Sequence, residues 1–245
     1  MSELQTMSTR EQRGRWAKPV DRLDVPDLSK EAINLNVRGR RPTSPVKGFG
    51  QLWQRTYTIQ LVNSAVTPAE VIQVWREQFA NFWPPGSRYY GIEKPIDAGD
   101  VAVLNLAGPA GIKIATGIVV IYADEESFCF ASVEGHMFGG MITFSAHQED
   151  GVTVAQVRAL LRASDPFFEV IVRSGLGTKA EDEFWHGTLT NLAAHFGVTG
   201  QPVSQRVVLL DPGVQWAEAK NIWYNAAIRT ALYMPVRWLR NLGGQ

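Results

Sequence analysis

The chain has 245 residues, of which 45% are hydrophobic and 10% aromatic, enough for a substantial core in one large domain or two small ones. A single cysteine, Cys129, excludes an internal disulfide and the zinc sites that are built on cysteine pairs. The net charge is zero and residues 51–200 are acidic, with nine Lys/Arg against sixteen Asp/Glu, so we expect no nucleic-acid partner.

The two ends of the chain differ from its middle. Residues 1–50 carry ten Lys/Arg against six Asp/Glu and contain four prolines, and residues 201–245 carry five Lys/Arg against two Asp/Glu. We therefore divide the chain into a basic N-terminal extension (1–50), a central domain (51–197), and a linker with a basic C-terminal helix (198–245). No apolar run is long enough for a signal peptide or a membrane span, so we expect a cytoplasmic protein.

The predicted elements follow one another clearly from Gln51 onward. Residues 52–61 form a strand-like stretch, and Thr67-Pro68 starts a helix that ends before Pro84. Five further strand-like stretches with turn signals between them predict an antiparallel meander, at 100–106, 112–123, 126–134, 137–147 and 152–162. Asp165-Pro166 then starts a long helix, 166–196, with a kink expected at Gly175 and Gly177.

This order, strand, helix, meander and long C-terminal helix, predicts an α+β fold. It resembles the helix-grip fold of the START and birch-pollen-allergen (SRPBCC) superfamily over about residues 51–197. The resemblance implies a curved antiparallel sheet wrapped around the long helix, with a ligand cavity between them.

A closer likeness is to a bacterial family of unknown function within that superfamily. The residues that carry it are Tyr90-Gly91, Gly99-Asp100, Glu134-Gly135-His136, Gly140, Phe144, Arg158 and Arg162. Where that family has proline and acidic residues after the Gly-His pair, this chain has Met137, Phe138 and Met141, which makes the hairpin more apolar.

The alternation of the strand at 126–134 predicts the cavity wall. Phe128, Phe130, Ser132 and Glu134 point to one side, and they combine aromatic surface with a hydroxyl and a carboxylate, as ligand cavities do. From the long helix we expect Phe168, Val172 and Phe184 to complete the wall. The alternative is that the aromatic residues simply fill a core under the helix.

The candidate catalytic groups are Glu134, His136, Tyr89 and Glu93. For His136 the alternative is a turn histidine bonded to backbone. The four histidines lack metal-ligand spacing, so we expect no metal. Residues 175–180 fit the letters of a dinucleotide fingerprint but lack the acidic residue about twenty positions later, so a helix kink is preferred and no cofactor is expected.

Three functions remain open from the sequence. The first is binding or carriage of an apolar small molecule, such as a lipid or polyketide, in an internal cavity. The second is a cyclase- or aromatase-type enzyme that uses the same cavity, and the third is a non-catalytic interaction module with a closed core.

Residues 216–242 predict an amphipathic helix that Pro235 should kink or end early. Three arginines lie on one side, and the apolar side contains Trp223, Ala227, Met234 and their neighbours. This face has three destinations: the protein's own surface, a second copy of the chain, or an anionic membrane with peripheral contact.

Overall fold

In the computed structural model, residues 15–25, 31–91, 95–108, 111 and 113–242 are described, with side chains up to residue 236. The described strands are β1 (Leu52–Gln60), β2 (Arg88–Tyr90), β3 (Val101–Ala107), β4 (Lys113–Ala123), β5 (Ser127–Ser132), β6 (Phe138–Glu149), β7 (Val152–Ala163) and β8 (Ser204–Asp211). The helices are α2 (Pro68–Gln78), α3 (Pro166–Arg173), α4 (Leu176–His195) and α5 (Ala226–Leu242), with 3-10 turns η1 (Asn34–Asn36), η2 (Pro45–Lys47), η3 (Phe79–Phe82) and η5 (Trp216–Tyr224).

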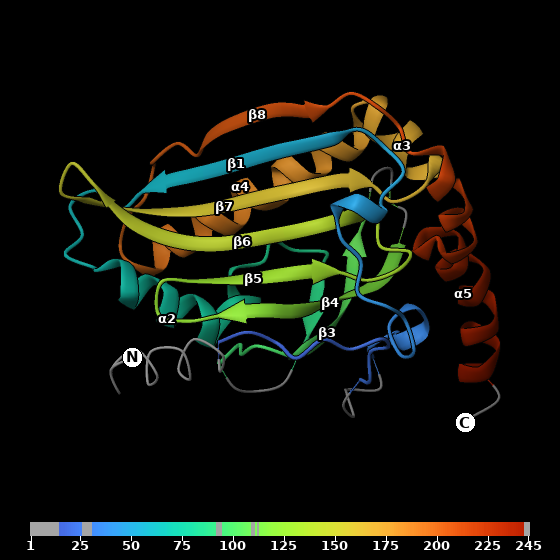
Figure 1. The fold of residues 1–245 in the computed structure, drawn as a ribbon. Helices are drawn as coiled ribbons and strands as arrows, with labels where there is room; N and C mark the ends of the chain where they lie inside the picture. The colour runs from blue at the N-terminus through green and yellow to red at the C-terminus, as the bar shows by residue number, and fades with distance from the viewer. Residues whose placement is uncertain (1–14, 26–30, 92–94, 109–110, 112, 243–245) are drawn as a thin grey trace, which may run out of the picture.

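The strands form one sheet in the order β2-β3-β4-β5-β6-β7-β1-β8, and every neighbouring pair is antiparallel. Figure 1 shows α4 passing behind β1 and β7, with α5 standing at one end of the sheet. This is the helix-grip architecture that the sequence predicts, and the meander strands lie where the alternating stretches place them.

Local sequence explains where the helices begin. Thr67 caps α2 through a capping box with Glu70, and the Asp165 side chain accepts a hydrogen bond from the Phe168 N–H at the start of α3. The single long helix expected over 166–196 is instead two helices. They are separated at Gly175, whose φ of 82° is left-handed and has no place inside an α-helix.

The main core lies between the concave face of the sheet, α2 and α4. Its fully buried members include Trp75 of α2, Phe128 and Phe144 of neighbouring strands, and Leu189 and Leu192 of α4. A second cluster lies around α3, with Phe168 packed near Met137, Phe138 and the first residues of α5. Aromatic and branched side chains therefore hold α2 and α4 against the concave face of the sheet.

The outer face of the sheet is also covered over β3, β4 and β5. Leu23, Val25 and Val37 of the N-terminal segment are buried against β3, β4 and β5, where Val103 and Val133 belong to the same cluster. The segment predicted to lack its own core thus packs onto the domain, as Figure 1 shows for the blue trace beside β3 and β4.

The sheet continues beyond residue 197. β8 lies in the segment that we expected to be a linker, yet it pairs with β1 from Leu52↔Asp211 to Thr58↔Ser204. The single helix expected over 216–242 is divided at Asn225, and α5 continues through Pro235 rather than ending there.

Candidate functional site: an apolar cavity with a buried carboxyl group

A cavity of about 140 Å³ lies between the concave face of the sheet, η3 and α4. Its wall is mostly apolar, and side chains from β3, β5, β6 and α4 contribute to it. The aromatic members of the wall are Phe79, Trp83, Phe130, Phe138, Phe184 and Trp185. This arrangement, concave and apolar with few polar groups, is typical of small-molecule sites.

Three of the predicted ligand-binding residues line this cavity: Phe130, Ser132 and Phe184. Phe128 points to the same side of β5 but lies behind the wall, fully buried and stacked on Phe144 with ring centroids 4.6 Å apart. Phe128 therefore fills the core under the helix, as the alternative to a cavity wall expects. The Ser132 hydroxyl donates to the Gly140 carbonyl (3.1 Å) and accepts from the Gly140 N–H (2.9 Å), which joins β5 to β6.

Glu134, Phe168 and Val172 do not line the cavity, which corrects the sequence-based assignment. β5 ends at Ser132, so strand alternation does not extend to Glu134, whose carboxylate accepts a hydrogen bond from the Arg41 N–H (3.3 Å). Phe168 and Val172 lie on α3 and pack in the second cluster, whose members Met137 and Phe138 line the cavity in their place.

Among the candidate catalytic residues, His136 lines the cavity. Its Nδ1 lies 3.0 Å from the Phe138 amide nitrogen and 3.1 Å from the Phe138 carbonyl oxygen, so the backbone fixes the ring, as the turn-histidine alternative expects. Burial lowers the pKa of His136 to about 4, although backbone hydrogen bonding opposes this, and the ring is therefore neutral at pH 7.

Tyr89 is half-buried and does not line the cavity; its ring packs edge-on against Phe79 and Trp83. Burial raises the pKa of Tyr89, with Asp100 adding to the effect, so the phenol stays protonated. Glu93, the remaining candidate, lies outside the described residues. Of the three candidates within the described residues, only His136 lies at the cavity wall.

Glu181 of α4, which the sequence analysis missed, also lines the cavity. The residue is 9% exposed, and neither carboxylate oxygen has a hydrogen-bond partner among the described residues. The nearest opposite charge is Arg55 of β1, whose Nε lies 3.4 Å from Glu181 Oε2. Burial raises the pKa of Glu181 to about 7, because Arg55 offsets only part of the desolvation.

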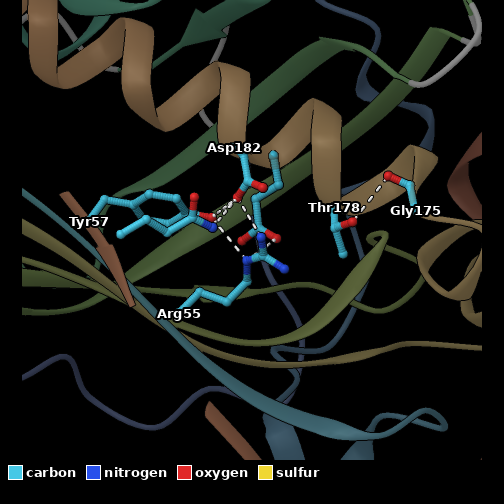
Figure 2. Close-up of polar contacts among 7 residues, drawn as sticks. Arg55, Tyr57, Gly175, Thr178 and Asp182 are labelled. Carbon is cyan, nitrogen blue, oxygen red and sulfur yellow. Dashed lines mark hydrogen bonds and ion pairs between the residues drawn. The ribbon is translucent and has the colours of Figure 1, made fainter. Parts of the chain in front are cut away.

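Arg55 is itself held by a second carboxylate. Figure 2 shows Arg55 and Tyr57 reaching from β1 toward Asp182 on α4, where the guanidinium pairs with Asp182 Oδ1. The Tyr57 hydroxyl donates to the same oxygen (2.7 Å), as does the Gln205 amide (2.7 Å). Burial opposes the charge on Arg55, but Glu181, Tyr57 and Asp182 outweigh it and raise its pKa.

One sequence signal could have found this cluster. Arg55, Tyr57 and Ile59 alternate along β1 and are all buried, so a charged residue occupies a core-facing strand position. A buried arginine requires an anionic partner, and α4 is the element that covers β1. The partner's identity depends on helix packing, which the sequence pattern does not specify.

A second hollow, of about 430 Å³, lies between the N-terminal segment, β2 to β4 and α5. Leu106 and Ala107 line both hollows. Its wall is more polar and includes Arg88, which is bonded to Glu31 at 3.3 Å.

Within the described residues no group of three side chains could hold a metal ion, and no helix is long and apolar enough to cross a membrane.

No protein-family model and no curated protein matches the chain. Solved structures with similar folds include protein Ms6760 from Mycobacterium smegmatis, 14% identical with a TM-score of 0.42 over 71% of this chain and 98% of that one. Major latex-like protein 151 from Panax ginseng is 14% identical, with a TM-score of 0.43 over 60% of this chain and 99% of that one.

The di-domain ARO/CYC protein StfQ of the steffimycin biosynthetic pathway is 14% identical, with a TM-score of 0.47 over 60% of this chain and 53% of that one. This chain therefore spans about half of StfQ. Because the similarity in sequence is low, the helix-grip assignment depends on the strand order and on the helix held against the concave face.

Proposed function

We propose that this protein binds a small apolar molecule in the cavity between the sheet and α4. The observation that supports the proposal is the cavity itself, an apolar space in a core that is otherwise closely packed. Its 140 Å³ is similar to the roughly 150 Å³ cavity that accommodates benzene in a well-studied protein. A single-ring molecule fits this space, whereas a larger lipid or polyketide would require the wall to move.

The test is to fill the cavity from one side. Ala180 of α4 lines it, so Ala180→Leu places three additional carbon atoms inside. Ala194 of the same helix is exposed, and Ala194→Leu is the matched control. Binding of toluene, followed by NMR chemical-shift changes, should be weakened at least tenfold by the first substitution and unchanged by the second. If toluene does not bind the unaltered protein, the third alternative, a closed interaction module, takes the place of this proposal.

A second candidate function is an enzyme of the cyclase or aromatase kind. Glu181, with a pKa of about 7 in an apolar wall, has the protonation behaviour that general acid–base catalysis needs. Native mass spectrometry of protein purified from its own cells identifies any retained molecule. When that molecule is added in excess, recovery at unchanged mass supports carriage, and conversion to a product supports the enzyme.

The C-terminal helix supports a further, surface role for this binding protein. Its first two residues, Ala226 and Ala227, are buried, but Ile228, Leu232 and Val236 form an exposed apolar stripe one turn apart, and Trp223 is 79% exposed. Residues 201–245 are basic, so the partner we propose for the stripe is an anionic membrane surface. Leu232→Ser should reduce sedimentation with acidic liposomes; concentration-dependent dimerisation without liposome binding would indicate a second copy of the chain instead.

A further inference from the structure

We propose that the ligand of the cavity is a protonated, N-alkylated amine with one apolar ring, and that its ammonium group pairs with Glu181. The inference depends on the proposed binding function and adds the chemical class of the ligand. It follows from three properties of the cavity wall: a carboxyl group whose negative charge is only partly neutralised, aromatic rings near that group, and a small number of free hydrogen-bond acceptors.

The first property is the charge around Arg55. One guanidinium faces two carboxylates, and Asp182 already receives hydrogen bonds from Arg55, from Tyr57 and from Gln205. Within the described part of the chain, Glu181 has only the 3.4 Å approach of Arg55 Nε and no hydrogen bond. When both carboxyl groups are ionised, the cluster carries one excess negative charge, which a cationic ligand would neutralise.

The second property is the aromatic wall. Phe184 and Trp185 follow Glu181 on α4 by about one turn, and both line the cavity together with Phe130 and Trp83. Aromatic faces carry partial negative charge and attract alkylated ammonium groups, while an uncharged amine or alcohol gains nothing from this term. The site thus offers a carboxylate for the charge and ring faces for the N-alkyl groups.

The third property is the small number of unused acceptors. Ser132 already exchanges two hydrogen bonds with Gly140, His136 Nδ1 is occupied by Phe138, and Ser87 accepts from the Ala107 N–H. Among the described side chains of the wall, only the Glu181 carboxyl has both oxygens unbonded. The Glu181 carboxylate can therefore accept the single N–H of a tertiary ammonium, whereas at least one of the three N–H groups of a primary ammonium would stay unpaired.

Trp83 supplies the opposite polarity at another part of the wall. Its indole N–H has no hydrogen-bond partner in the part of the chain that the structure describes, and its ring packs on Phe184 with centroids 4.9 Å apart. Because Phe184 lies about one helical turn from Glu181, a hydrogen-bond acceptor at the end of the ligand away from the ammonium would pair with the Trp83 indole N–H.

Amine binding should depend on the ionisation of Glu181. The groups that face it or its partners are Arg55 and Tyr57 on β1, Asp182 and His186 on α4, and Gln205 on β8. With a pKa of about 7, Glu181 is mostly protonated at pH 6 and mostly ionised at pH 8. For an amine that stays protonated between pH 6 and pH 8, the affinity should rise about tenfold over this range.

The experiment compares N,N-dimethylbenzylammonium with isobutylbenzene, its uncharged carbon analogue, by NMR titration of the full chain. We expect the amine to bind more tightly than the hydrocarbon at pH 8 and to lose about tenfold at pH 6, while the hydrocarbon shows no pH dependence. Glu181→Gln should remove the preference for the amine and retain hydrocarbon binding. Glu183→Gln, an exposed position paired with Lys179 (3.8 Å), is the matched control and should behave like the unaltered protein.

The outcomes separate this inference from the function on which it depends. If isobutylbenzene binds and the amine does not, or if Glu181→Gln leaves the amine preference intact, the inference is overturned and the apolar-ligand function remains. If neither molecule binds, both are overturned.

Discussion

Gly135 shows how one residue of the Glu134-Gly135-His136 sequence serves the fold. Its φ of 86° is left-handed, and a Cβ atom there would overlap the carbonyl oxygen of Tyr224. The Gly135 carbonyl also accepts a hydrogen bond from the Ala226 N–H (2.9 Å), at the start of α5. The turn therefore forms the docking point of the C-terminal segment.

We expect Gly135→Ala to lower the free energy of unfolding by about 2 kcal/mol or more, because backbone strain and overlap with Tyr224 add together. Gly99 is the matched control, since its φ is 93° but no atom of the described residues lies within 4 Å of the added carbon. Gly99→Ala should show only the cost of the backbone conformation, about 1 kcal/mol. Urea denaturation measures both, and equal losses would contradict the close contact with Tyr224.

Glu181 should also make stability depend on pH. Its pKa is raised from the ordinary 4.5 to about 7, so the folded state holds a proton that the unfolded chain releases between these values. The stabilisation is complete below pH 4.5 and is lost as pH rises through 7, by roughly 1–3 kcal/mol in total. His136, with its pKa lowered to about 4, acts in the opposite direction at acidic pH.

The contribution of Glu181 is therefore measured as the difference in free energy of unfolding between Glu181→Gln and the unaltered protein. Glu181→Gln should become progressively more stable relative to the unaltered protein from pH 5 to pH 8, in urea denaturation at each pH. Parallel stability curves for the two proteins would show that the folded state does not retain this proton.

The sequence predicted part of the candidate site at the residue scale. Strand alternation predicted Phe130 and Ser132 and helical spacing predicted Phe184, and all three line the cavity, while their contact with a ligand stays a prediction. Glu181 was not predicted, because its importance arises from contact with Arg55, 126 positions earlier in the chain, and only the packing of α4 on β1 brings them together. Local patterns do not contain that information.

At the scale of elements, the sequence was most informative where a residue has a local physical role. Thr67 and Asp165 predicted helix starts, and the alternating stretches predicted the meander strands. Gly175 was expected to kink a helix and in fact separates two. The division at Asn225 was not expected, since it depends on a contact: the Asn225 amide donates to Asp165 (2.8 Å), while its carbonyl caps α5 at the Ile228 N–H.

The docking of α5 on the protein's own surface can be tested at Thr230. Its hydroxyl accepts a hydrogen bond from the Ala115 N–H of β4 (3.1 Å), and Thr230 is 1% exposed. Thr230→Val keeps the shape but leaves that N–H unpaired, which should cost about 1–3 kcal/mol. Leu232→Ala, on the exposed stripe, should change thermal stability little. A neutral Thr230→Val would indicate that α5 is not closely held against β4.

At the scale of the whole molecule, both extensions pack against the domain: β8 pairs with β1, and the N-terminal segment lies on β3 to β5. The N-terminal segment covers the outer face through a few widely spaced apolar residues, so it shows no periodicity in the sequence. Arg162 of β7 joins three distant parts: it donates to the carbonyls of Gly50 (2.6 Å) and Gly213 (2.9 Å) and pairs with Asp211. These contacts connect the central domain with the two extensions, which the amino-acid composition alone would divide from it.

The fragment 51–197 is the span that the sequence alone suggests as the domain. It lacks β8, so β1 becomes an exposed sheet edge, and it lacks the N-terminal segment that covers Val103, Val119 and Val133. An open edge beside an uncovered apolar face favours aggregation. We therefore expect 51–197 to be insoluble or to bind the dye ANS, with no cooperative unfolding transition.

A series of fragments separates the two causes. The fragment 51–211 restores β8 but leaves the outer face uncovered, so it should protect the β1 edge from hydrogen exchange while still binding ANS. The full chain should unfold in one cooperative thermal transition, because both extensions contribute to the sheet and to its covering. If 51–197 instead unfolds cooperatively at a temperature near that of the full chain, the extensions are appendages rather than parts of the folding unit, and the contacts of β8 with β1 and of the N-terminal segment with β3 to β5 contribute little to stability.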